Sequence, residues 1–140
     1  CAAIQQAVLG RPIVYLDLNR IAADYLAAAL SSPGHPLAAL LSSPGQRAAQ
    51  FPETSWFYAR SGRKVAVLRP TPEGFAGRGV SVASSAVAAG LRDGTLCPGL
   101  LPTFAAVACL NPLRCLGSFN QARYLAEIRA AWGAAPELWD

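Results

Sequence analysis

The stretch at residues 96–132 reads LCPGLLPTFAAVACLNPLRCLGSFNQARYLAEIRAAW and has the clearest order of structural signals in the chain. Its apolar residues 100–110 predict a buried helix, with Leu101, Phe104 and Val107 in the core. Asn111-Pro112 ends that helix, because the residue before a proline is disfavoured in the helical region. The apolar residues 113–116 then predict a buried strand that includes Leu116.

A glycine-serine turn, Gly117-Ser118, follows the predicted strand, and the serine is a good N-cap for a helix that runs to about Trp132. A strand, a glycine turn and a helix start together direct free backbone N–H groups and the positive end of a helix dipole to one place. The sequence therefore predicts an anion site here. Its expected ligand-binding residues are Gly117, Ser118, Phe119, Asn120, Gln121, Arg114, Arg123 and Tyr124.

Working outward, residues 13–16 (IVYL) predict a second strand, because β-branched and aromatic residues favour strands. Asp17 or Asn19 is a suitable cap for a helix at about 20–30, and a further helix is expected at about 82–92. Residues 54–70 predict a β-hairpin, with strands at 55–59 and 64–68. We expect one α/β domain over residues 1–140: a small Rossmann-like, mostly parallel sheet with flanking helices, strands 13–16 and 113–116 at its centre and the hairpin peripheral.

Two loops separate these elements. Residues 31–45 hold two Ser-Ser-Pro-Gly turns around a short apolar segment, which predicts a loop, a short helix and a loop. Residues 71–74 predict a turn, and the glycine-rich residues 75–79, with Arg78 among them, are interpreted as an ordinary flexible connection. They lack the lysine and the serine or threonine of a phosphate-binding loop.

The composition argues against a disordered, a membrane-spanning or a nucleic-acid-binding protein. More than half of the 140 residues are apolar, which argues against disorder, and the apolar runs are shorter than the roughly 20 residues of a membrane span. Residues 47–92 carry seven basic side chains against Glu53 and Glu73, which would suit an acidic partner. Aromatic residues are not interleaved as in nucleic-acid sites, so an anionic small molecule is the expected partner, with no nucleic acid and no membrane.

Cysteine and histidine residues suggest no metal site. Four cysteines stand at positions 1, 97, 109 and 115 without metal-binding spacing, and His35 is the only histidine. Cys109 and Cys115 lie in apolar runs and are expected to be reduced packing residues. The sequence requires no cofactor, and a cytoplasmic location is expected. Cys1 and His35 are the candidates for catalysis, as nucleophile and proton carrier.

The sequence starts at Cys1, and three interpretations compete. The chain is a fragment or processed part of a larger enzyme, a lipoprotein with a lipid-bearing first cysteine, or a hydrolase with an N-terminal cysteine nucleophile. A lipoprotein normally has a polar tether after its cysteine, whereas an apolar run begins at Ala2 here. The first interpretation is favoured, with the rest of a longer polypeptide or a partner subunit outside these residues.

Residues 54–132 resemble the later part of the core domain of the bacillithiol synthase family, the cysteine-adding enzymes. The likeness lies in the order of a hairpin with GRK, a polar loop, a helix, a Leu-Cys-Pro start to an apolar helix, and a final strand, turn and helix. Gly117 matches a family glycine and Tyr124 a family tyrosine, whereas the proline and glutamate of the family's turn are absent. The resemblance implies a Rossmann-like core from an enzyme that adds an amino acid to a sugar-linked molecule.

The sequence suggests two functions from different classes. The first is a domain of a bacterial biosynthetic enzyme that binds an anionic metabolite (a phosphate, nucleotide or carboxylate) at the Gly117-Ser118 turn, with ligase-like addition of an amino acid. The second is a non-catalytic structural or protein-interaction subunit, in which the turn only caps a helix.

Overall fold

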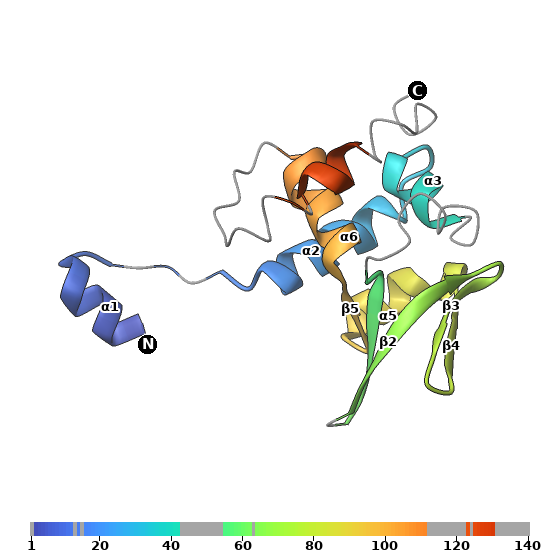
Figure 1. Ribbon diagram of the computed structural model, residues 1–140, viewed down its shortest axis with the longest axis horizontal. Helices are drawn as coiled ribbons and strands as arrows, with labels where there is room; N and C mark the ends of the chain where they lie inside the picture. Colours follow the sequence, from blue (N-terminus) through green and yellow to red (C-terminus); the bar gives the residue numbers. More distant parts are fainter. Residues whose placement is uncertain are drawn as a thin grey trace.

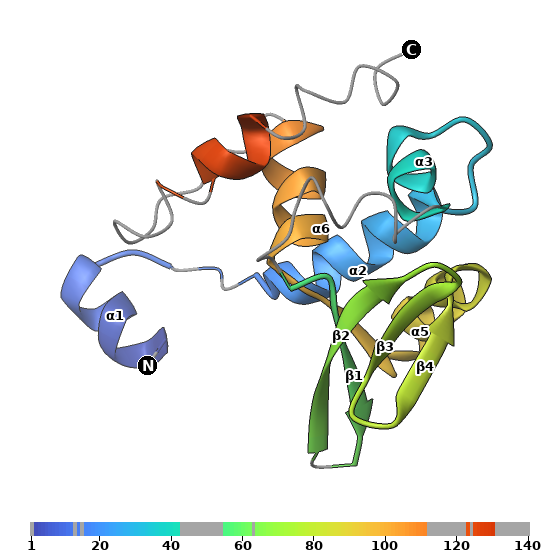
Figure 2. The same cartoon turned by 45° about the vertical axis from the view of Figure 1, so that its right-hand side comes forward.

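The structure is a computed structural model, and it describes residues 2–12, 14, 16–42, 55–62, 64–111, 123 and 125–130. Five strands form one antiparallel sheet in the order β4-β3-β2-β1-β5. They are β1 (Phe57–Ser61), β2 (Lys64–Thr71), β3 (Gly74–Gly77), β4 (Val80–Ala83) and β5 (Leu96–Pro98). The sheet curls into a half-barrel, as Figures 1 and 2 show.

Helices precede, interrupt and follow the sheet. They are α1 (Ala2–Leu9), α2 (Leu18–Ala29), α3 (Pro36–Ser42), the 3-10 turn η1 (Ser84–Ala86), α5 (Val87–Asp93), α6 (Leu100–Phe104) and the π-helical turn η2 (Ala105–Cys109). Helix α2 packs against α5, β5 and α6, whereas α1 lies apart from the rest of the molecule (Figure 1).

The expected Rossmann-like, mostly parallel sheet is wrong. Tight turns join β1 to β2, β2 to β3 and β3 to β4, and parallel neighbours would need a crossover of a dozen residues or more. The one long connection, from β4 through η1 and α5, brings β5 beside β1 in the antiparallel sense. Val14 and Leu16 lie outside any strand, and residues 113–116 lie outside the described residues.

The predicted hairpin at 54–70 is confirmed, but it is central to the sheet and not peripheral, since β1 and β2 each have a strand on both sides. The helix expected at 82–92 begins later, because residues 80–83 form β4. Residues 96–98, interpreted only as the entry to the apolar helix, form β5.

The helical predictions with a clear apolar pattern are confirmed. Asp17 caps α2, and its carboxylate accepts a hydrogen bond from the Arg20 N–H at 3.1 Å. Residues 100–109 form the buried helix, with Leu101, Phe104 and Val107 all in the core. Leu116, expected to be buried, lies outside the described residues.

The core lies between the inner face of the sheet and the helices. Along β2 the side chains alternate, with Ala66 and Leu68 buried and Val65 and Val67 exposed, because successive residues of a strand point to opposite faces. Phe75 contacts Phe57 edge-on, with ring centroids 4.8 Å apart, at the filled end of the half-barrel.

Candidate functional site

The inner face of the sheet is filled at one end and open at the other. Phe57 pairs with Leu68 across β1 and β2, and two residues further along Ala59 pairs with Ala66. The large pair meets Phe75 and closes that end of the interior, whereas the two alanines leave space. The open end lies beside the β1–β2 and β3–β4 turns.

Close approach of β3 to β2 narrows this end from one side. A Cβ built on Gly77 would lie 2.0 Å from the main-chain oxygen of Val67, so only glycine permits the approach. The curl of the sheet therefore depends on a residue without a side chain at this point.

A cavity of about 570 Å³ occupies the open end, which we call the sheet mouth. It is lined by Ala59, Arg60, Lys64, Val65, Ala66, Arg78 and Val80. Of these described lining residues, three are basic and none is acidic. Its volume lies within the range of about 300–1,000 Å³ that is typical of small-molecule sites.

Two of the basic residues lie in or directly beside the turns that frame the mouth. Lys64 opens β2 on the same face as Ala66 and Leu68, by the alternation of the strand. Arg78 occupies the β3–β4 turn with a φ of +46°, a left-handed conformation that is uncommon for residues other than glycine. Gly79 follows with a φ of +78°, so both central residues of this two-residue turn have positive φ, as tight hairpins require.

An arginine at this position is unfavourable for the turn itself. Asparagine or glycine would adopt the left-handed conformation at lower cost, and such strained residues concentrate at ligand sites. The turn thus places an exposed arginine at the mouth at the expense of local backbone energy.

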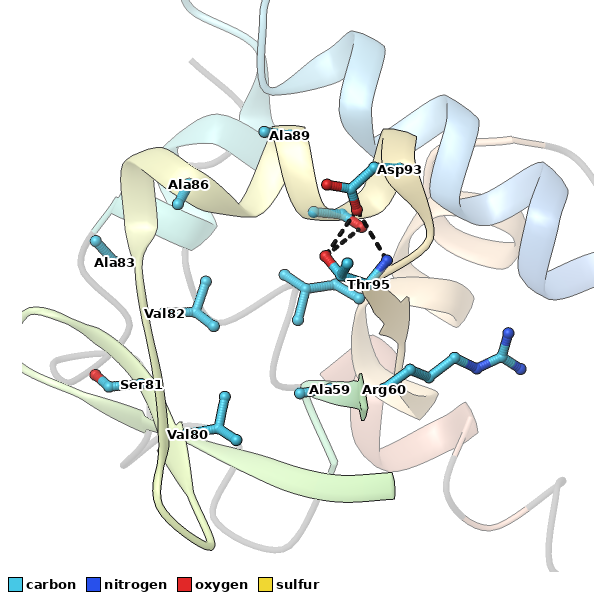
Figure 3. A pocket seen from close by; sticks show the side chains of 12 residues that line it. Ala59, Arg60, Val80, Ser81, Val82, Ala83, Ala86, Ala89, Asp93 and Thr95 are labelled. Carbon is cyan, nitrogen blue, oxygen red and sulfur yellow. Dashed lines mark hydrogen bonds between the residues drawn. The ribbon is translucent and has the colours of Figure 1, made fainter. Parts of the chain in front are cut away.

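A second cavity of about 390 Å³, which we call the side cavity, lies between β4, α5 and the β5 edge of the sheet. It shares Ala59, Arg60 and Val80 with the sheet mouth. In Figure 3 the side chains of Val80 and Val82 face this space, while the Arg60 side chain extends away from it. The side cavity is therefore mainly apolar and adjoins the basic mouth.

Asp93 and Thr95 form the polar border of the side cavity (Figure 3). The Thr95 hydroxyl donates to Asp93 Oδ1 at 2.7 Å, and the Thr95 backbone N–H donates to the same oxygen at 2.8 Å. These two bonds stabilise the carboxylate and hold the pKa of Asp93 below its ordinary value of 3.8. Both bonds go to Oδ1, so the carboxylate stabilises the turn after α5 through that one oxygen.

Most residues of the predicted anion site lie outside the described residues. These are Cys1, Arg114, Gly117, Ser118, Phe119, Asn120, Gln121 and Tyr124. Arg123 is described: its side chain is 79% exposed and lies 3.8 Å from Glu127 in a helical i,i+4 pair. Arg123 lines neither of the two cavities, so the structure does not bring it to the sheet mouth.

His35 has a structural environment. Its Nδ1 accepts a hydrogen bond from the Leu37 N–H at 3.1 Å, at the start of α3, and its ring meets Tyr25 edge-on at 6.0 Å. These contacts orient the imidazole toward the helix start, and it lines neither cavity. The described geometry gives it no reaction partner.

Lys64 and Arg78 are the site residues to which the sequence assigned no role. The interpretation of residues 75–79 as a flexible connection is wrong, because residues 75–77 belong to β3 and Arg78 lies in the turn that follows it. The excess of basic residues between positions 47 and 92 was a signal for the two site residues, but it did not say which would meet. Two separate turns must come to the same end of a curled sheet before the two side chains share a cavity.

Within the described ranges, no three His, Cys, Asp or Glu side chains come together as a metal site would require. Among the same residues, no helix has the length and apolar character needed to cross a bilayer. Comparisons with protein-family models, with characterised proteins and with solved structures returned no match, so the function must be argued from the geometry of this chain alone.

Proposed function

We propose that this domain binds an amphipathic anion, a small molecule with a carboxylate or phosphate head and an apolar body. The head is held at the sheet mouth by Lys64 and Arg78, and the body lies over Ala59, Ala66 and Val80 toward the side cavity. The observation that carries the proposal is an apolar cavity whose described charged lining residues are all basic.

Charge supports the head-group part of the proposal. The chain has a net charge of +4, and no carboxylate among the described lining residues of the mouth competes for its cations. Arginine and lysine form charge-assisted hydrogen bonds with carboxylate and phosphate, and these are stronger than neutral ones. The strained backbone of Arg78 is further support, because it positions a cation where the turn alone would favour another residue.

The lining of the two cavities supports the proposal that the ligand has an apolar body. The inner-facing residues at the mouth are alanines and a valine, so an acyl or aromatic body meets carbon on this side. The side cavity extends the apolar lining with Val82, Leu96 and Ala86. A bare phosphate would leave most of this surface uncovered, which favours a ligand with a hydrophobic portion.

The proposal concerns binding and assigns no reaction. Ligase-like chemistry in a larger biosynthetic enzyme, a role for Cys1 as nucleophile, and an anion site at the Gly117-Ser118 turn remain predictions. The mouth replaces that turn as our preferred location for the anion, because its lining is described and includes three basic residues.

Isothermal titration calorimetry with three matched probes tests the proposal. Octanoate carries both a head and an apolar body, octanol lacks the charge, and inorganic phosphate lacks the apolar body. We expect octanoate to bind at least about tenfold more tightly than either of the others, since loss of a charge-assisted contact or of buried apolar area costs 1.4 kcal/mol or more.

Variants locate the site. Lys64→Gln and Arg78→Gly should each weaken octanoate binding, and Ala66→Leu should block it by filling the cavity. Arg69→Gln is the matched control: Arg69 lies on the exposed face of β2 and lines neither cavity, so its loss should not change the affinity. Equal affinity for octanoate and octanol, or equal weakening by Lys64→Gln and Arg69→Gln, would refute the proposal.

A further inference from the structure

The N-terminal arm, which we define as residues 2–17, exposes an unusual amount of apolar surface. Ile4 is 71% exposed, Val8 79%, Val14 80% and Leu16 72%, and Leu9 is exposed as well. These are half of the large hydrophobic side chains that the described residues expose. Figures 1 and 2 both show α1 held away from the body of the molecule.

The described residues of helix α1 provide little local stabilisation. They read AAIQQAVL, with no acidic residue in the first turn and no basic residue in the last. Ile4 and Val8 are four residues apart and share one face of the helix, so this face needs an apolar surface to cover it.

The body of the protein offers a matching surface, which we call the outer groove. It is a cavity of about 570 Å³ on the face of the sheet opposite the core. Its lining is Leu18, Asn19, Tyr58, Arg60, Val65, Cys97, Pro98, Gly99, Leu100, Thr103 and Phe104. Val65 and Leu100 are 51% and 42% exposed, and Val67, which pairs with Tyr58 across the strands, extends the apolar face.

The N-terminal arm joins the body of the protein at the edge of the outer groove. Leu18 and Asn19, the first residues of α2, belong to the groove lining and follow the arm directly. Figures 1 and 2 show α1 apart from the body, so α1 is not seated in the groove of its own chain. The side chains of Ile4 and Val8 are therefore left uncovered by the body of the same chain.

We propose that two copies of this chain exchange arms, with α1 of each copy seated in the outer groove of the other. The eight residues from Gly10 to Asp17 span up to about 26 Å when extended, enough to reach a neighbouring copy. A two-fold arrangement lets both grooves and both helices be covered by the same contact. The face of α1 that carries Ile4 and Val8 is uncharged and apolar, and it matches the exposed valine and leucine side chains of the groove.

A cysteine in the groove makes the proposal directly testable. Cys97 lines the outer groove, has a free thiol and is half-buried. In a background with Cys1→Ser, Cys109→Ala and Cys115→Ser, the substitution Val8→Cys places a single thiol on the apolar face of α1. Mild oxidation should then give a covalent dimer on a non-reducing gel, formed between Cys97 of one copy and position 8 of the other.

Two control variants test whether the cross-link depends on the face of α1 and on Cys97. Gln6→Cys in the same background puts the thiol on the opposite side of α1 and should cross-link at least about tenfold more slowly. Adding Cys97→Ser to the Val8→Cys protein should abolish the dimer. A linked monomer would mean that the arm folds back on its own body. Persistence of the dimer without Cys97, or equal rates for positions 6 and 8, would also overturn the proposal.

The oligomeric state of the cysteine-intact protein gives an independent measurement. Light scattering after gel filtration should show twice the chain mass, and Val8→Asp or Leu100→Asp should raise the dimer dissociation constant by about tenfold or more. Gln6→Asp should have little effect. Lys64→Gln should leave dimerisation unchanged, so failure of the anion proposal and failure of arm exchange are distinguishable. A chain that is monomeric at every concentration would refute arm exchange.

Discussion

Arg92 on α5 donates a hydrogen bond from Nη2 to the main-chain oxygen of Ala27 on α2, at 3.1 Å and across 65 residues of sequence. The same nitrogen contacts the Ser31 hydroxyl just after α2. Carbonyls at the end of a helix lack partners within it, and the negative end of the helix dipole lies there. Arg92 therefore ties the helix that closes the half-barrel to the C-terminal end of α2.

Replacement of this arginine should destabilise the fold. Arg92→Ala should lower the free energy of unfolding by about 1–2 kcal/mol, because it removes charge-assisted bonds to a helix end that is only partly exposed. Urea denaturation followed by tryptophan fluorescence measures the change. Arg92→Lys keeps the charge and should recover part of the loss, and a loss below about 0.5 kcal/mol in Arg92→Ala would show that solvent replaces the bonds.

Arg78 should show a conflict between stability and binding. Arg78→Gly relieves a left-handed backbone strain of about 1–2 kcal/mol, partly offset by the greater freedom of glycine in the unfolded chain, so stability should rise by about 0.5–1 kcal/mol. The matched change Gly79→Ala introduces strain at φ +78° without a steric clash and should lower stability by about 1 kcal/mol. Differential scanning calorimetry gives both values. If Arg78→Gly is destabilising, the arginine contributes folding energy that outweighs the strain.

The pKa of Asp93 should lie below its ordinary value. Its folded-state pKa is depressed by the Thr95 hydroxyl and backbone N–H, so its contribution to stability is present above pH 3.8 and is lost as the pH falls through the folded-state pKa. Thr95→Val removes the hydroxyl bond and should move the pKa of Asp93 up toward 3.8. Carboxyl ¹³C NMR titration measures both proteins, and equal pKa values would show that the hydroxyl does not act on the carboxylate.

Cys109 should react slowly with thiol reagents. Burial raises the pKa of its thiol above the ordinary value of 9.0, and nearby Arg129 offsets only part of this, so little thiolate is present near neutral pH. In a protein whose other three cysteines are serine, labelling by Ellman's reagent at pH 8 should be much slower in the native state than in urea. Equal rates would contradict the packing role. Cys115 shares the expectation but lies outside the described residues.

The sequence predicted those elements whose signal is local. The helix that begins after Asp17, the hairpin at 54–70 and the buried helix from Leu100 each follow from a side-chain period with a cap or a turn beside it. Each can be recognised within a window of about 18 residues, and each is present in the structure.

The prediction of a parallel sheet was wrong because the topology depends on which strands pair, and strand pairing cannot be recognised from local sequence patterns. An apolar run at 13–16 and another at 113–116, with helical patterns between them, suggested parallel strands, yet the ladder starts in the hairpin and continues through β3 and β4. Val80–Ala83 was not predicted as a strand, and its last two residues were assigned to the helix expected at about 82–92, because four residues carry little periodicity. The three residues of β5 become a strand only because β1 offers them an edge.

The site was less predictable than the fold. An excess of basic residues indicated an anionic partner, but the convergence of Lys64 and Arg78 depends on the curl of the sheet, and that curl depends on the missing side chain of Gly77. A glycine of this kind cannot be distinguished in a single sequence from one that serves a flexible loop.

The pairing of Phe57 with Pro98 sets the order in which this chain can fold. Strands β1 to β4 follow one another through tight turns, so their ladder can form by local zipping within microseconds. The ladder between β1 and β5 closes a loop of about forty residues, and that closure costs chain entropy before α5 and α6 can compensate for it. On a ribosome, the meander emerges before α5, β5 and α6, so the core around Phe57, Leu68 and Phe75 is incomplete at that stage. Synthesis must proceed past Pro98 before the core can be completed, and the nascent chain is exposed to aggregation during this interval.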